Sequence, residues 1–157
     1  MQLRGLERSE FDRRAQELRT YFNEARERLS QQFGSYASVN DTIWFILNEL
    51  VMTEHNIDRL ANLYLHMAEI ASVEGKDPMP YVAEARKYQA QRNTSDLLMW
   101  LDSVKYVRIY TTNDDLVCKN CRKLDNKRFR IEDALLNMPI PHKCISPTGC
   151  HCYFIVG

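Results

Sequence analysis

The distribution of cysteines constrains this chain more than any other feature. All five cysteines of the 157 residues lie between positions 118 and 152, and the first 117 residues contain none. An odd number would leave one cysteine unpaired in a disulfide framework. The first ten residues are charged and lack the apolar run of a signal peptide, which predicts a reducing cytosolic compartment where stable disulfides are rare. The cysteines therefore predict a metal site.

The cysteines fall into two halves with the spacing of a zinc site. Cys118 and Cys121 form a C-x2-C pair, which brings two thiolates to one side of an ion. Twenty-two residues lie between Cys121 and Cys144 of the second half, near the range typical of paired cysteine sites. A tetrahedral site takes two ligands from each half, so we predict one structural Zn²⁺. The preferred ligands are Cys118, Cys121, Cys144 and Cys150.

The fourth ligand stays open at this point. On an extended segment Cys150 and Cys152 would point the same way, so Cys152 is an alternate for that position. His142 is a lesser alternate, and His151 would point away from its cysteine neighbours. The turn-forming residues 147–149 (Pro-Thr-Gly) would let the loop between the second-half cysteines fold back on itself.

Nothing in the sequence indicates a catalytic metal. A catalytic zinc keeps three protein ligands and an open position, with an acid or base nearby. The chain has neither an HExxH motif nor a His-x-Glu before the cysteine pair. We therefore predict that the protein is not an enzyme, with a zinc hydrolase or nuclease as the least favoured alternative.

Basic residues surround the first cysteine pair. Four thiolates on Zn²⁺ would carry a net charge of about −2, which nearby cations would offset. The same residues could instead contact phosphate, as in a zinc-dependent nucleic-acid-binding regulator, or the acidic face of a protein partner. The whole chain has a net charge of zero, so nucleic acid is possible but not favoured. These residues are Lys119, Arg122, Lys123, Lys127, Arg128 and Arg130.

The first two thirds of the chain predict a helical bundle. Ser9 and Asp12 resemble a capping box, and apolar residues then recur at spacings of three and four as far as Phe33. This pattern predicts a helix over about residues 10–34, ending near Gly34. It packs either on its own bundle or on another chain, because the narrow apolar seam fits both.

Further helices follow as far as residue 103. Ser38 begins a segment, residues 39–52, that is apolar on nearly all sides and predicts a buried helix. A second helix ends at Gly75, Asp77-Pro78 begins a third, and Thr94 or Ser95 caps a short fourth. We therefore assign residues 1–103 to a helical bundle.

The pattern changes after residue 103. Alternating β-branched and aromatic residues predict a strand over residues 104–112, with shorter strands at 127–131 and 152–156 and a short helix at 132–137. Residues 104–157 would then be a small α+β module with too few apolar residues to fold alone, and a metal would supply the missing stability. The predicted fold class is mainly α, with this zinc-binding module at the C-terminal end.

The module also carries a recognisable motif. The cysteine pair is followed by a Leu-Asp-Asn-Lys-Arg-Phe stretch, an acidic helix start, a proline-rich segment ending in histidine, and Gly-Cys-His-Cys. This order resembles the C-terminal cysteine motif of Mu F-like phage minor head proteins, the head-morphogenesis family. The resemblance covers about residues 104–157. Its parts are Cys118 and Cys121, residues 124–129, residues 131–133, residues 139–142 and residues 149–152.

The resemblance implies a non-enzymatic protein that acts in phage or prophage head assembly, or at a related protein interface. It implies a protein partner or a homo-oligomer, and a cytoplasmic or virion-associated location. No apolar run approaches the ~20 residues that a membrane span needs. Three positions depart from the family pattern: residues 144–149 are inserted before the last cysteines, His151 replaces an arginine, and Asn126 replaces a glycine.

Overall fold

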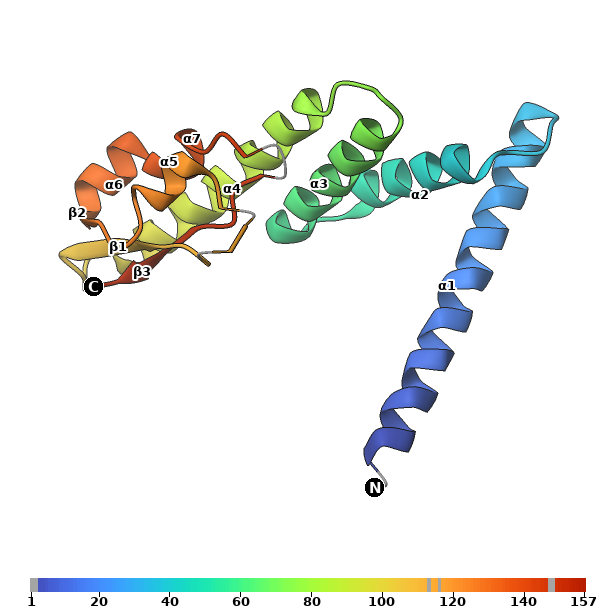
Figure 1. Ribbon diagram of the computed structural model, residues 1–157, viewed down its shortest axis with the longest axis horizontal. Helices are drawn as coiled ribbons and strands as arrows, with labels where there is room; N and C mark the ends of the chain where they lie inside the picture. Colours follow the sequence, from blue (N-terminus) through green and yellow to red (C-terminus); the bar gives the residue numbers. More distant parts are fainter. Residues whose placement is uncertain (1–2, 113, 116, 147–148) are drawn as a thin grey trace. The chain divides into compact units, whose positions relative to one another are not determined.

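The computed structural model is mainly helical, with a small antiparallel sheet near the C-terminal end (Figure 1). It describes residues 3–112, 114–115, 117–146 and 149–157. The packing divides the chain into two units, Met1–Thr53 and Glu54–Gly157. The fold class predicted from the sequence is confirmed.

The first unit is a pair of helices, α1 (Leu3–Phe33) and α2 (Val39–Thr53). The guanidinium of Arg28 donates to both carboxylate oxygens of Glu49 at 2.8 and 3.0 Å, which joins the two helices. Helix α1 ends at Gly34, whose φ of 67° is the left-handed conformation expected after a helix. The backbone N–H of Asp41 donates to Ser38 Oγ at 3.0 Å, so the predicted cap of α2 is confirmed.

Two expectations for this unit are wrong. Helix α1 begins at Leu3, before the expected cap at Ser9, because residues 3–8 are mostly strong helix formers. The capping contacts predicted for Ser9 and Asp12 involve side chains outside those that the structure describes. Helix α2 is not buried: of its residues only Thr42 and Leu47 are fully covered, and Met52 is 82% exposed. A two-helix unit offers α2 one neighbour, which cannot cover a helix that is apolar on all sides.

The second unit begins with a helical hairpin, α3 (Ile57–Val73) and α4 (Met79–Trp100). Asn56 caps α3 by accepting from the N–H of Arg59, and Gly75 has the positive φ of 73° that its predicted role as a helix stop requires. Asp77 Oδ1 accepts from the N–H of Met79 at the start of α4. The break expected near residues 94 and 95 is absent, because Thr94 Oγ1 donates to Ala90 O within one continuous helix.

The sheet has the strand order β2-β1-β3, with β1 (Tyr106–Tyr110) in the centre between β2 (Arg128–Arg130) and β3 (Tyr153–Val156). All three strands lie where the alternating pattern predicts them. Short helices α5 (Lys119–Arg122), α6 (Ile131–Asn137) and α7 (Pro139–His142) connect and cover the strands. Asn126 has a φ of 59° in the turn before β2, a left-handed conformation that asparagine adopts more readily than most residues.

The core of the second unit joins α4 to the sheet. Leu97 of α4 is fully buried with Val107 and Ile109 of β1, and helix α4 also lies against α6, α7 and β3. The boundary between units therefore falls after Thr53, whereas the sequence analysis placed it after residue 103. A helical hairpin supplies the apolar surface that the small sheet lacks.

Candidate metal centre

The five cysteines come from three segments that the fold brings together. Cys118 is the N-cap of α5, and Cys121 lies within that helix. Cys144 follows α7, and Cys150 and Cys152 lie on the extended segment that enters β3. Four of the five are buried, Cys118 is partly exposed, and all are free thiols.

The sulfurs form two overlapping groups, each with its Sγ atoms within 4.8 Å of one another. One group is Cys118, Cys121 and Cys144, and the other is Cys121, Cys150 and Cys152. Tetrahedral Zn–S bonds of about 2.3 Å place ligand sulfurs roughly 3.8 Å apart, and the Sγ atoms of Cys118 and Cys144 are 3.9 Å apart. The cluster therefore has dimensions that suit a metal ion, and Cys121 belongs to both groups.

Backbone amides point at the cluster. The N–H groups of Cys121 and Ile145 donate to Cys118 Sγ at 3.4 and 3.5 Å. Such bonds stabilise thiolate over thiol, which is the form that binds a metal.

The cluster also shifts the acidity of its thiols. Burial raises the pKa of Cys118, but the two amide donors together with hydrogen bonds from the Cys121 and Cys144 thiols outweigh that effect and lower its pKa to about 7. Hydrogen bonds from its neighbours lower the pKa of Cys150, while the same crowding raises that of Cys121. The pKa of Cys152 rises to about 12, since the lowering hydrogen bond from Cys121 is outweighed by its contact with Cys150 and by burial. Without a cation, neighbouring thiolates repel, so only part of the cluster ionises.

Helix α4 holds the cysteine segments in place. Gln89 Nε2 donates to the carbonyl of Cys150 at 2.9 Å, and Arg86 Nη2 donates to the carbonyl of Ser146 at 3.2 Å. One turn further along, Asn93 Nδ2 donates to the carbonyl of Ile140 at 2.9 Å. Sequence reasoning missed these residues. Their signal is a polar stripe at spacings of three and four that continues directly into buried Leu97.

The structure separates the histidines from the sulfurs. His142 is exposed at the end of α7, and neither sulfur group of the described residues includes it or His151. His55 and His66 are exposed in or beside α3. The ligand set of Cys118, Cys121, Cys144 and Cys150 stays a prediction, because Cys150 and Cys152 both lie beside Cys121.

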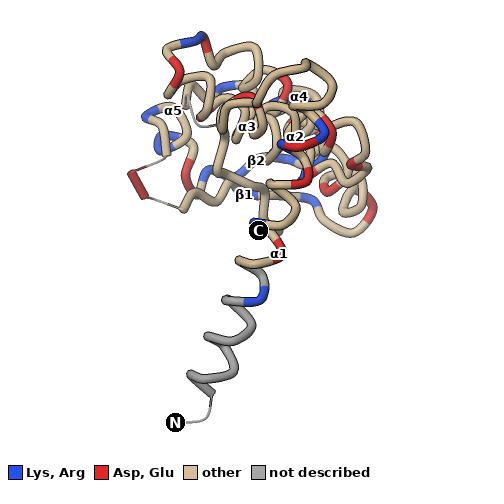
Figure 2. The backbone as a smooth tube through the Cα atoms, turned by 90° about the vertical axis from the view of Figure 1, so that its right-hand side faces the viewer, with Lys and Arg blue, Asp and Glu red and all other residues tan. Residues whose placement is uncertain are grey.

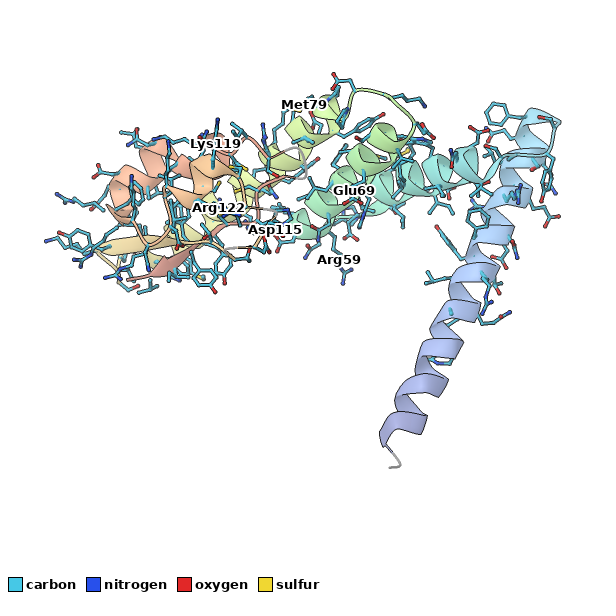
Figure 3. The ribbon with its side chains drawn as sticks, viewed as in Figure 1. Arg59, Glu69, Met79, Asp115, Lys119 and Arg122 are labelled. Carbon is cyan, nitrogen blue, oxygen red and sulfur yellow. The ribbon has the colours of Figure 1, made fainter. Side chains whose placement is uncertain are left out.

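The six basic residues around the first pair do not act as one group. Arg122 donates to the carbonyls of Val117 and Asp114 at 3.1 and 2.9 Å, which fixes the loop that leads into Cys118. Lys119 and Arg122 lie on α5 (Figure 3), Lys123 and Lys127 flank the following turn, and Arg128 and Arg130 belong to β2. In the described part of the chain, no recorded hydrogen bond joins any of them to a sulfur.

Gly149 offers a test of how tightly the second cysteine segment is held. Its φ is 88°, and an added Cβ would lie 2.5 Å from Cδ2 of Leu65 in α3. We expect Gly149→Ala to destabilise the unit by roughly 2 kcal/mol or more, because the backbone strain of about 1–2 kcal/mol is joined by a steric clash. Thermal unfolding of the full chain measures the loss.

Gly75→Ala is the matched control, since Gly75 has a φ of 73° but open space around its Cβ position. This variant should lose only the stability that corresponds to the backbone strain. Equal losses of stability in the two variants would mean that the Leu65 side chain moves aside without a cost in free energy. The other turn residues expected in this loop, Pro147 and Thr148, lie outside the described residues.

No family model, no curated protein and no solved structure matches this chain. Among the described residues, no helix combines the length and the hydropathy that a bilayer crossing requires.

Proposed function

We propose that the cysteine cluster binds one structural Zn²⁺ that stabilises the second unit. The observation that carries this proposal is the pair of overlapping sulfur groups around Cys121. Thiolate ligands without carboxylates favour zinc over magnesium, calcium or manganese. A tetrahedral ion would take Cys121 together with three of the other four sulfurs.

The same arrangement supports a role other than catalysis. A catalytic zinc needs a ligand position open to water and a base beside it. In the described residues, both sulfur groups consist of cysteines alone, with neither histidine nor carboxylate. Five thiols exceed the four coordination positions of a tetrahedral ion, so thiolates can occupy all four positions and leave none for water. The protein then acts by binding and not by turnover.

The first unit supports an interaction role. Leu18 is 68% exposed, Phe33 71% and Met52 82%, and the buried apolar side chains described in this unit are only Ala25, Leu29, Ala37 and Leu47. A unit with so few buried apolar side chains has little core of its own, and packing its exposed apolar side chains against another protein would supply more. The partner is another protein or a second copy of this chain, and the motif of the second unit resembles that of phage head-morphogenesis proteins. We therefore propose a zinc-stabilised interaction protein of phage or prophage type.

Native mass spectrometry before and after a strong chelator tests the proposal. We expect one zinc per chain. Its removal should unfold the second unit. Helices α1 and α2 should keep their helical circular-dichroism signal, because they lie in a separate unit. A chain that carries no metal and instead shows disulfide masses under non-reducing conditions would contradict the proposed site. The same spectra report the oligomeric state, which tests the interaction role separately.

A further inference from the structure

The sheet of the second unit has one covered face and one open face. Val107, Ile109 and Phe154 point into the core, where Ile131 and Ala134 of α6 and Leu97 of α4 cover them. The alternate residues of each strand point the other way. Figure 1 shows the helices α5 and α6 on one side of strands β1 and β3. We call the other side the open sheet face; its residues are Tyr106, Arg108, Tyr110, Arg128, Arg130, Tyr153 and the half-buried Ile155.

Tyrosines occupy both ends of this face. Tyr110 and Tyr153 are direct cross-strand partners with ring centroids 5.1 Å apart, and they are 44% and 43% exposed. At the other end, the guanidinium of Arg128 lies 3.9 Å from the ring centroid of Tyr106. Buried aromatic rings stabilise a core, but these rings leave much of their surface in water. Such flat surfaces on a rigid sheet suit stacking with planar ligands.

Arginines occupy the space between the tyrosines. Arg108 of β1 lies directly opposite Arg128 of β2, and Arg130 is the partner of Tyr106. Like charges in direct opposition across a sheet destabilise it. Among the described residues, the only ion pair recorded for these arginines joins Arg130 to Glu132 at 3.6 Å. An anion between Arg108 and Arg128 would remove their repulsion.

This concentration of charge is local. Figure 2 shows acidic and basic positions interleaved along the backbone of the chain, whose net charge is zero. The seven residues of the open sheet face include three arginines, three tyrosines and no acid. The face therefore combines a cationic centre with flanking aromatic rings, although the chain as a whole has no basic excess.

We propose that the open sheet face binds single-stranded nucleic acid. Its arginines would contact phosphates, while Tyr110 and Tyr153 would stack on bases, which are exposed only in an unpaired strand. An acidic protein segment would satisfy the arginines but would leave the exposed rings without planar partners. The proposal goes beyond the interaction role of the first unit, and it uses neither the sulfurs nor α1 and α2.

Fluorescence anisotropy with the zinc-loaded full chain tests the proposal, using fluorescein-labelled oligo(dT) and oligo(rU) of equal length. Three phosphate contacts predict that log K falls with log salt at a slope of roughly −2 for a single strand. In the double variant Arg108→Ala/Arg128→Ala the slope should become shallower by roughly 1.4. In Tyr110→Ala/Tyr153→Ala the affinity should fall by roughly five- to one-hundred-fold for each lost stack, with the slope unchanged.

Arg59→Ala is the matched control, because Arg59 is an exposed arginine of the same unit that belongs to α3 and not to the sheet (Figure 3). It should bind as the unaltered chain does. A duplex of the same sequence should bind more weakly. The proposal is overturned if the tyrosine variant keeps full affinity, or if polyphosphate or polyglutamate competes as well as unlabelled oligonucleotide. Metal content, measured on the same samples, distinguishes these outcomes from failure of the zinc site.

Discussion

Replacing Cys121 with serine is expected to remove the metal and unfold the second unit. Cys121 is 1% exposed and is the one cysteine that both sulfur groups share, so every tetrahedral ligand set drawn from them loses a member. A structural zinc contributes about 10–16 kcal/mol in small zinc domains, which is comparable to the whole stability of a typical domain, about 5–15 kcal/mol. Metal analysis should show less than one zinc per chain, and hydrogen exchange should show lost protection in β1, β3 and α6.

His142→Ala is the control for this experiment. His142 is a metal-binding residue type close in sequence to the cluster, but it is exposed and lies outside both sulfur groups. This variant should keep one zinc and its native exchange pattern. Retention of a full equivalent of zinc by Cys121→Ser would show that the other four cysteines form the site without it.

Replacing the remaining cysteines one at a time would identify the fourth ligand. One of Cys150→Ser and Cys152→Ser should release the ion, while the other should keep it. The spare thiol is then the one whose loss leaves the metal content unchanged. Equal loss in both variants would mean that each cysteine is needed, either as a ligand or for the packing of the segment before β3.

Leu97→Ala is expected to destabilise the second unit by about 2–5 kcal/mol. Leu97 is fully buried and joins α4 to the sheet and to the cysteine segments, so its truncation leaves a cavity among them. Thermal unfolding of the metal-loaded chain should shift downward by on the order of 10 °C. The metal should also become easier to remove with a chelator, because the fold that holds its ligands opens more often.

Leu98→Ala is the matched control. Leu98 is the next residue of the same helix and is 54% exposed, so its replacement should change the stability by less than about 1 kcal/mol. The comparison also tests the unit boundary. If residues 104–157 folded independently of α4, Leu97→Ala would leave the affinity for metal unchanged.

Local elements of this fold could be read from the sequence because their causes are local. The alternation of residues 104–112 predicts β1, Ser38 predicts the start of α2, and Gly75 predicts the end of α3. The start of α1 and the continuity of α4 could not be read in this way. In both regions capping residues lie inside a helix that its neighbours propagate, and Thr94 bonds the preceding turn in place of a cap.

The candidate site shows the same difference between features with local causes and features that depend on the whole fold. Sequence reasoning predicted that the five cysteines gather at one candidate metal site, because thiol chemistry and short spacing do not depend on the rest of the fold. It did not identify Gln89 and Asn93, which lie far from the cysteines in the sequence and are polar residues on an otherwise ordinary helix face. Their buried side chains satisfy backbone carbonyls that would otherwise be unpaired.

The sequence by itself therefore determined that this protein is mainly helical, has a small sheet near its C-terminal end, and gathers its thiols in a cluster that could hold a metal. Only the tertiary structure decided that α4 belongs with that sheet, that Cys121 is the shared sulfur, and that tyrosines and arginines gather on one open face. The reason is physical. Capping, turns and strand alternation act over a few residues, whereas burial and the meeting of distant side chains depend on how whole elements pack.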